Sequence, residues 1–396
     1  MKTLGIHHIS LISRHGQEII DFYSGFLGLK LVKKTLNYEN NQQYHLYFGT
    51  DSAEVGSLLT FFPHPLAKQG LKGDGQVRTI TLAIPKNSFS FWENRLRKFE
   101  IEYAYTRRFK QTYLSFNDLD NIEIELTETD LGNPNLYEFN GVTKEVAIKG
   151  IYGVILNAGN PESENMLKEL GYQKTDESSL FDRFKVNDQL GGLVDLYKIR
   201  EELGIQSIGT VHHIAYAVND DEINLWHEKL IKEGFKVTEV KDRKYFKSIY
   251  FKEQSGITYE LATQTPGMLI DESIDQLGKN FIIPEQFTNL DKNQLNQLMP
   301  LFIKENQKLT KYDYIDKKSF DEINRHKVVL QEINKLARIA KERELTPDEF
   351  KLRKELREEY VSSITRGVRN MIEKVQVVDK DGNVENSFVK KEKEVN

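Results

Sequence analysis

VHHIAYAV, residues 211–218, and GIHHISLI, residues 5–12, each open an apolar run with a tandem pair of histidines. The chain holds nine histidines in 396 residues, and four of them stand in these two segments. Apolar and β-branched residues over four to eight positions are typical of a buried β-strand. The two segments therefore predict two equivalent strands that carry histidine pairs in register.

A unit of one strand, one amphipathic helix and several further strands recurs four times in the first two thirds of the chain. Helices are indicated by apolar residues three or four positions apart, such as Ile19, Phe22 and Phe26. A module of about 50 residues cannot cover both faces of its own sheet, so the modules are expected to pair. The sequence predicts an α+β fold in which four βαβββ modules pair into two curved-sheet barrels, each with a sheltered concave side.

Strand alternation decides which histidine of each pair faces inward. Successive side chains point to opposite faces of a strand, so His8 and His213 lie among small or polar neighbours, whereas His7 and His212 lie among bulkier ones. We expect His8 and His213 to face the concave side. The alternative is that a strand histidine only satisfies a local hydrogen bond.

Glu260, in GITYELAT at 256–263, is a lone carboxylate in an otherwise apolar strand. Burying it without a partner would be costly, so it needs a cation or a hydrogen-bonding group unless it lies on an edge strand facing water. Two histidines and one carboxylate leave three coordination positions of an octahedral metal ion open, as in non-haem Fe(II) oxygenases. Matching Gly256 to Gly56 places Thr60 opposite Glu260, and threonine is a poor metal ligand. A site of three ligands is therefore favoured over one of four.

The composition points to a small-molecule partner. With 55 basic and 60 acidic residues the net charge is −5, so neither nucleic acid nor a membrane surface is indicated. The absence of cysteine excludes disulfides and thiolate metal sites. There is no signal-like N-terminus and no apolar run of about 18 residues, so we expect a cytoplasmic protein.

The most specific stretches resemble the vicinal oxygen chelate superfamily. Within it, FYSGFLGLKLVKKTLNY, YHLYFG, AIPKNSFSFW and DRKYFKSIYF, together with the two histidine segments, are most similar to the hydroquinone ring-cleaving dioxygenases of the MhqO-like branch. The resemblance covers residues 4–310. It implies a metal site at His8, His213 and Glu260 and further active-site groups at His7, His212, Arg243 and Tyr250.

The resemblance also implies a reaction. Fe(II), or alternatively Mn(II), would bind a small aromatic diol and O2 as co-substrate, and the ring would open beside a hydroxylated carbon, in detoxification or degradation of aromatic compounds. Arg243 would offset negative charge, and Tyr250, His7 or His212 would exchange protons. Two rivals remain open. One is a glyoxalase-like lyase or isomerase that uses the metal as a Lewis acid, and the other is a non-catalytic protein that binds an aromatic compound.

Of the other histidines, His45 in YHLYFG is expected to be structural or to stand beside the metal ligands. The rest are expected to be surface groups, and they are His15, His64, His227 and His326.

The end of the chain is more densely charged than the modules. Ser319 with Glu322, and Thr346 with Pro347 and Glu349, are start signals for two helices joined by the short turn RELT. This segment resembles a small bacterial family of unknown function, the YnzC-like family, which implies no chemistry. Oligomerisation, binding of a protein partner and passive fusion are the roles left open for the hairpin.

The chain is thus expected to have four parts. They are an N-terminal vicinal oxygen chelate domain at 1–135, a C-terminal one at 146–310, a helical hairpin at 319–378 and a disordered tail at 379–396.

Overall fold

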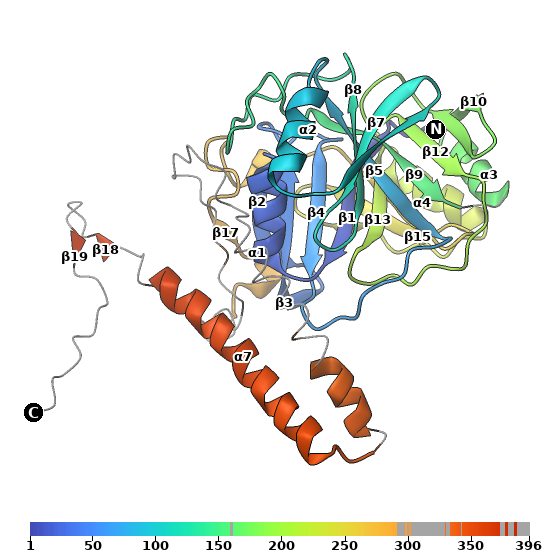
Figure 1. The fold of residues 1–396 in the computed structure, drawn as a ribbon. Coiled ribbons are helices and arrows are strands. Elements are labelled where there is room, and N and C mark those ends of the chain that lie inside the picture. The colour runs from blue at the N-terminus through green and yellow to red at the C-terminus, as the bar shows by residue number, and fades with distance from the viewer. Residues whose placement is uncertain are drawn as a thin grey trace, which may run out of the picture. The chain divides into compact units, whose positions relative to one another are not determined.

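The computed structural model describes residues 1–158, 161–290, 298, 301, 329, 333–341, 343–372, 377–378 and 384–385. The chain divides into two compact units, Met1–Ile315 and Asp316–Asn396. Figure 1 shows the elements of both.

The first unit contains the four predicted modules in order. The first is β1 (Ile6–Ser13), α1 (Gly16–Ile19) continued by the π-helix η1 (Ile20–Phe26), β2 (Lys30–Asn37), β3 (Asn40–Gly49) and β4 (Leu58–Pro63). The second is β5 (Gln76–Ile84), α2 (Phe89–Lys98), β6 (Tyr103–Arg108), β7 (Gln111–Asn117) and β8 (Glu123–Glu128). The third is β9 (Gly150–Asn157), α3 (Pro161–Glu169), β10 (Gln173–Glu177), β11 (Phe181–Lys185) and β12 (Leu193–Tyr197). The fourth is β13 (Thr210–Ala217), α4 (Ile223–Lys232), β14 (Lys241–Asp242), β15 (Lys247–Lys252) and β16 (Thr258–Ala262).

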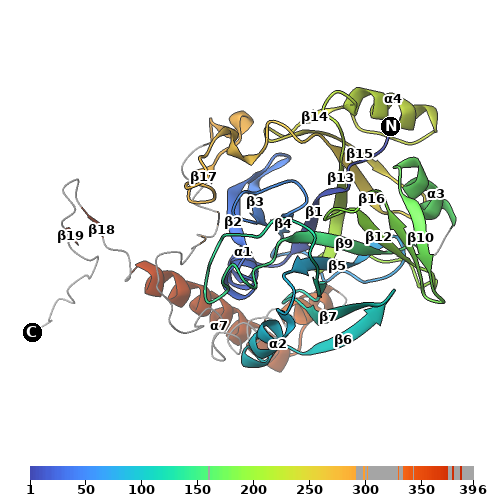
Figure 2. The ribbon, with the colours of Figure 1, turned by 90° about the horizontal axis from the view of Figure 1, so that it is seen from above.

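The modules pair across the middle of the sequence. The first and fourth modules form a nine-stranded sheet in the order β14-β15-β16-β13-β1-β4-β3-β2-β17, where β17 is Phe281–Ile282. The second and third form an eight-stranded sheet in the order β10-β11-β12-β9-β5-β8-β7-β6. In Figure 2 the nine-stranded sheet curls into a half-barrel. The predicted α+β fold of paired modules is confirmed. Each sheet takes strands from both of the ranges 1–135 and 146–310, whose division into domains stays a prediction.

The two faces of β1 show how the sequence pattern builds the sheet. Ile9 and Leu11 are fully buried, and Leu11 lies beside Phe61 of β4, whose ring packs 4.4 Å from that of Tyr23 in η1. This face of the sheet therefore packs against the module's helix, where apolar burial stabilises it. His8 and Ser10 belong to the opposite face by strand alternation. The period of two in the sequence thus assigns the polar residues to the concave side.

The segment after β16 closes the first unit. It contains the 3-10 helices η2 (Met268–Ile270) and η3 (Glu285–Phe287) and the short strand β17. Lys33 of β2 is fully buried and holds this segment through ion pairs of 2.6 Å to both Asp271 and Glu272. Buried charges that are paired in this way tie the closing segment to the sheet.

The second unit contains α7 (Pro347–Ile372) and helical residues at 333–341. Thr346 and Glu349 form the predicted cap, since the Glu349 N–H donates to the Thr346 hydroxyl and the Thr346 N–H donates to the Glu349 carboxylate. Ile333 and Leu336 pack with Leu356 of α7, which makes a helix pair. The first start signal, at 319–322, and most of 379–396 lie outside the described residues. Val384–Glu385 forms a short strand, β19, paired with β18 (Val377–Val378).

No helix in the described ranges is both long and apolar enough to span a bilayer.

Candidate metal centre

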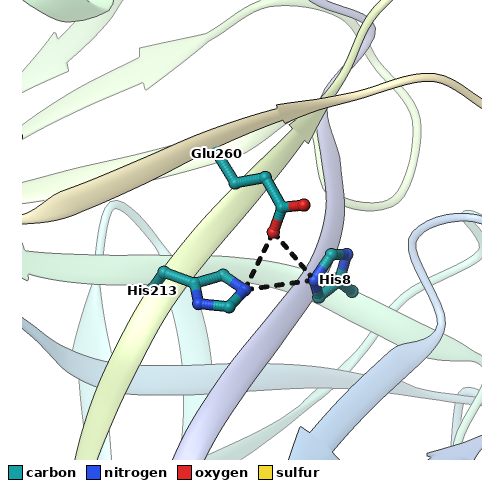
Figure 3. A group of neighbouring side chains, drawn as sticks. All are labelled: His8, His213 and Glu260. Carbon is teal, nitrogen blue, oxygen red and sulfur yellow. Dashed lines mark hydrogen bonds and ion pairs between the residues drawn. The ribbon is translucent and has the colours of Figure 1, made fainter. Parts of the chain in front are cut away.

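His8, His213 and Glu260 come together on three neighbouring strands of the nine-stranded sheet (Figure 3). The antiparallel pairing of β1 with β13 brings the two histidines side by side, and β16 places Glu260 next to them. The Nε2 atoms of His8 and His213 lie 3.2 and 2.8 Å from the same carboxylate oxygen, Oε2 of Glu260, and 3.3 Å from each other. All three side chains are buried. The sequence predicted these three residues as a metal site, and their ligand atoms form one compact triangle.

The triangle has the dimensions of a set of metal ligands. Nitrogen and oxygen ligands about 2.1 Å from an ion and 90° apart lie about 3.0 Å from one another, within the range of the three measured distances. Within the described residues, neither carboxylate oxygen of Glu260 has a well-directed hydrogen-bond partner, although both are buried. Burial by itself would raise the pKa of Glu260, but the adjacent His8 and His213 hold it well below its ordinary value. A buried anion facing two imidazole nitrogens is a site that can hold a metal ion.

His7 and His212 occupy β-bulges beside the two ligands. Between β1 and β13 the pairing skips His7 on one strand and His212 on the other. A bulge leaves one residue unpaired and re-aims its side chain. As a result the Nδ1 atom of each bulge histidine lies 2.9 Å (His7) or 2.8 Å (His212) from the Nδ1 atom of the ligand that follows it. Strict alternation turned these two histidines away from the site, and the bulges correct that inference.

A carbonyl group determines which nitrogens of His7 and His8 carry protons. His7 Nε2 lies 3.1 Å from the carbonyl oxygen of Thr263, which can only accept, so His7 Nε2 is the donor. Burial and the neighbouring His8 lower the pKa of His7 to about 3, so its ring is neutral and its Nδ1 is an acceptor. His8 Nδ1 must then donate to His7, so the neutral His8 ring that binds a metal has its lone pair on Nε2, the atom that faces Glu260. The Thr263 carbonyl thereby prepares His8 as a ligand.

His212 is arranged differently from His7. Burial and His213 lower its pKa to about 4, so this ring is neutral as well. If His213 turns an Nε2 lone pair toward the triangle, its Nδ1 donates to His212 Nδ1, and the proton of His212 is then on Nε2. His212 also lines the cavity next to the triangle, and no backbone carbonyl within the described residues holds its Nε2. The two bulge histidines are therefore not equivalent.

Tyr250 and Arg243 lie on the same side of the site. Tyr250 of β15 stands directly opposite Glu260 in the strand register. Burial and the nearby Glu260 raise the pKa of Tyr250 well above its ordinary value, so its hydroxyl stays protonated. Arg243 places Nε 3.3 Å from the Tyr250 hydroxyl and Nη2 3.1 Å from the carboxylate of Glu39, which lies in the turn between β2 and β3. All four additional groups implied by the family resemblance, His7, His212, Arg243 and Tyr250, thus lie around the triangle.

A cavity of about 480 Å³ opens onto His8 and His213, and Arg243, Tyr250 and His212 also line it. Its size and its aromatic walls suit a small planar ligand. Sequence reasoning missed several of the lining residues, namely Tyr38, Glu39, Phe62, Lys241 and Phe246. No local signal marks them, because the first and fourth modules must pair before they meet.

His45 lines this cavity, and its ring is neutral because burial and the neighbouring His8 and His213 hold its pKa well below the ordinary value. Its Nδ1 lies 2.9 Å from the Tyr47 hydroxyl, its Nε2 lies 3.0 Å from the Thr60 hydroxyl, and its ring stacks on Phe62 with 4.3 Å between the ring centroids. Both ring nitrogens thus have hydrogen-bonding partners, and the expectation that His45 is structural or stands beside the metal ligands stays a prediction. His64, expected to be an ordinary surface group, is exposed but lines the cavity.

Thr60 takes the place of a fourth ligand. It pairs with Ser10 in the parallel register of β1 and β4, just as Glu260 pairs with Ala215 in that of β13 and β16. Its hydroxyl lies 2.6 Å from that of Ser10 and also binds His45. The ligand set in the described residues therefore has three members.

Comparison with known proteins places the chain in a family. Residues 5–126 match the model of the Glyoxalase/Bleomycin resistance protein/Dioxygenase superfamily. The Bacillus subtilis protein named "Putative ring-cleaving dioxygenase MhqO" is 40% identical over 308 residues, which cover 77% of this chain and 98% of that protein. The chain belongs to the MhqO-like family. The Chlorohydroquinone/hydroquinone 1,2-dioxygenase of Sphingobium indicum is similar to this MhqO-like chain, with 31% identity over 75% of the chain and 96% of that protein.

A solved structure supports the same family assignment. A crystal structure of a "putative dioxygenase" from Bacillus subtilis superposes on the MhqO-like chain with a TM-score of 0.74, and the two are 39% identical over 77% of this chain and 99% of that one. Residues 328–390 match a family of bacterial proteins of unknown function, DUF896. The resemblances stated from the sequence, one for the modules and one for the C-terminal region, are thus confirmed.

Proposed function

We propose that this chain is an Fe(II)-dependent extradiol dioxygenase that opens the ring of a hydroquinone or a catechol. The observation that carries the proposal is the buried triangle of His8, His213 and Glu260, which leaves one side of a bound ion free toward the cavity. The relation to a hydroquinone 1,2-dioxygenase supports the substrate class.

The donor set fits iron. Two imidazoles and one carboxylate form the facial arrangement used by non-haem Fe(II) oxygenases, and Mn(II) is the alternative for the same ligands. An Fe(II) ion here would supply open positions for the diol and O2 together and a path for electrons from the ring to oxygen. The protein's own part is to hold the ligands in the correct tautomer, which the Thr263 carbonyl does for His8 through His7.

The remaining groups handle protons and charge. His212, with its proton on Nε2, donates a hydrogen bond to a diol oxygen in the cavity. Tyr250, which stays protonated, donates a second one from the side of Glu260. Arg243 offsets negative charge on the ring oxygen, and Glu39 and the Tyr250 hydroxyl hold its guanidinium in place.

The aromatic walls hold the ring. Phe246 lies 5.2 Å from the ring of His8, and Phe62 lies 5.4 Å from the ring of His212, so aromatic surfaces adjoin both histidine pairs. A planar aromatic diol can stack in such a space while its oxygens turn to the polar side. Thr60 argues against the rival function, a glyoxalase-like lyase, because it leaves the position equivalent to Glu260 without a carboxylate ligand.

The test is O2 consumption. The protein is purified without oxygen, loaded with Fe(II), and given a panel of hydroquinones and catechols together with isotope-labelled O2. We expect O2 uptake and both labelled atoms in a ring-opened product. Fully metallated protein that consumes no O2, or one that isomerises a thiol adduct instead, would refute the proposal.

Two buried glutamates provide a matched pair of variants. Glu260→Gln removes a charged ligand and should lose the metal. Glu253→Gln alters a buried carboxylate that binds Ser163 and Ser255 instead, and this variant should keep it. Normal metal content in Glu260→Gln would show that the triangle is not the site.

A further inference from the structure

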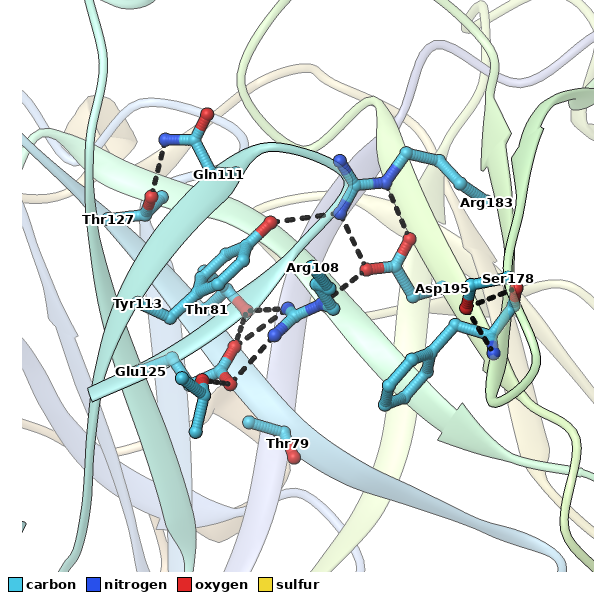
Figure 4. A network of polar contacts seen from close by, with 12 residues as sticks. Thr79, Thr81, Arg108, Gln111, Tyr113, Glu125, Thr127, Ser178, Arg183 and Asp195 are labelled. Carbon is cyan, nitrogen blue, oxygen red and sulfur yellow. Dashed lines mark hydrogen bonds and ion pairs between the residues drawn. The ribbon is translucent and has the colours of Figure 1, made fainter. Parts of the chain in front are cut away.

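The eight-stranded sheet contains a cluster of four buried charges (Figure 4). Arg108 of β6, Glu125 of β8, Arg183 of β11 and Asp195 of β12 are each at most 9% exposed. Arg108 donates from Nε to Asp195 at 2.7 Å and from its two terminal nitrogens to Glu125 at 2.8 and 2.7 Å. Arg183 donates to both oxygens of Asp195 at 2.8 Å. The proposed reaction uses none of these groups.

The strand register shows that this cluster is the counterpart of the metal centre. In the first sheet the bulges fall at His7 and His212. In the second sheet the pairing of β5 with β9 skips the equivalent residues, Arg78 and Tyr152. The residues that follow them, Thr79 and Gly153, therefore stand where His8 and His213 stand in the first sheet. The imidazole ligands are absent at these positions.

The carboxylates, in contrast, are present at both equivalent positions. Asp195 pairs with Ile155, two residues after Gly153, as Glu260 pairs with Ala215 two residues after His213. By the same register Glu125, which pairs with Thr81, corresponds to Thr60. The last strand of each module in the second sheet, β8 and β12, thus carries an acid. The corresponding strands of the first sheet, β4 and β16, carry one threonine and one acid.

Arg108 occupies the space between these two acids. Its guanidinium lies 3.6 Å over the ring of Tyr113 and bridges Glu125 to Asp195. Two carboxylates and two guanidiniums give no net charge, so the burial of all four is compensated. A planar fork of donors suits this bridging better than an ammonium would.

We propose that Arg108 takes the place of a metal ion. In the second sheet its guanidinium occupies a cation-binding position between Glu125 and Asp195. The intact chain then binds one metal per chain, at His8, His213 and Glu260. The donors that surround Arg108 are oxygens, from Glu125, Asp195 and the hydroxyl of Thr81. Oxygen donors select hard divalent cations such as Mn²⁺, so removing Arg108 opens a site for such an ion.

The experiment compares Mn²⁺ bound per chain, by elemental analysis and by the paramagnetic resonance of bound Mn²⁺, in proteins that differ only at Arg108. Arg108→Ala empties the position, and Arg108→Met keeps an apolar stem over Tyr113 so that the sheet stays packed. We expect each to bind one Mn²⁺ more than its parent, both in the wild-type chain and in the Glu260→Ala background. The comparison in that background makes the outcome independent of the proposed function.

Two controls define the site. Arg97→Ala, which removes an exposed arginine of α2 that contacts Glu93 and Asn94 of the same helix, should gain no Mn²⁺. Glu125→Ala added to Arg108→Met should abolish the gain. A folded Arg108 variant with no additional Mn²⁺ overturns the proposal. If neither variant folds in metal-free buffer, Mn²⁺ must restore folding, and its failure to do so also overturns the proposal.

Discussion

Replacing His7 by phenylalanine tests whether the Thr263 carbonyl sets the tautomer of a metal ligand. In the native site one hydrogen bond joins the Thr263 carbonyl to His7 at 3.1 Å, and a second joins His7 to His8 at 2.9 Å. Phenylalanine keeps the aromatic packing against Phe246, whose ring lies 4.9 Å from that of His7, but it cannot accept the hydrogen bond from His8. His8 Nδ1–H then has no acceptor, and the proton can move to Nε2, the atom that faces the metal.

The expected magnitude follows from the loss of one partner of a metal-bound histidine. Such partners contribute roughly 10- to 100-fold to metal affinity, which corresponds to about 1.4 to 2.7 kcal/mol. His7→Gln should recover part of this loss, because its amide oxygen can accept from His8 and its amide nitrogen can donate to Thr263. Removing Glu260, a ligand itself, should cost more than either change.

The assay is a competition titration of Fe(II) or Mn(II) against a chromogenic chelator under anaerobic conditions, with the fold of each variant checked by circular dichroism. The expected order of affinity is wild type, His7→Gln, His7→Phe and Glu260→Gln. Wild-type affinity in a folded His7→Phe protein, or no advantage of glutamine over phenylalanine, would refute the tautomer argument.

Three further predictions can be tested with the same protein. Arg243→Gln should keep the metal but lower kcat/KM by roughly 100-fold, because a charged contact to a ring oxygen is lost; steady-state O2 uptake measures this. Burial lowers the pKa of His7 to about 3 and of His212 to about 4, so the unfolded metal-free chain binds more protons than the folded one below about pH 6.5. Its free energy of unfolding should therefore fall with pH from about 6.5 to 4, by up to about 1.4 kcal/mol per pH unit for each histidine, and urea unfolding of the His7→Gln variant should show a smaller slope. A chain ending at Ile315 should keep its metal and its activity, since the first unit contains the whole triangle; metal content and O2 uptake of the truncated protein decide this.

Much of the site was accessible from the sequence because strand alternation is a local property. The period of two in GIHHISLI and VHHIAYAV assigned His8 and His213 to one face, and Glu260 was conspicuous as a charge in an apolar strand. The same rule was wrong for the orientation of His7 and His212. A bulge at each position changes the direction of one side chain, and a bulge depends on the partner strand as well as on the strand's own sequence.

The sequence by itself determined the α+β modules through their repeats, the three candidate ligands through strand alternation and a lone carboxylate in an apolar strand, and the helical cap at Thr346 through the spacing of Thr346, Pro347 and Glu349. Only the tertiary structure decided which modules share a sheet. That pairing brings Glu39 of the first module to Arg243 of the fourth and Arg108 of the second to Asp195 of the third. Contacts between residues so far apart in the chain leave no periodic pattern, because they depend on how the sheets close and not on the conformation of any one segment.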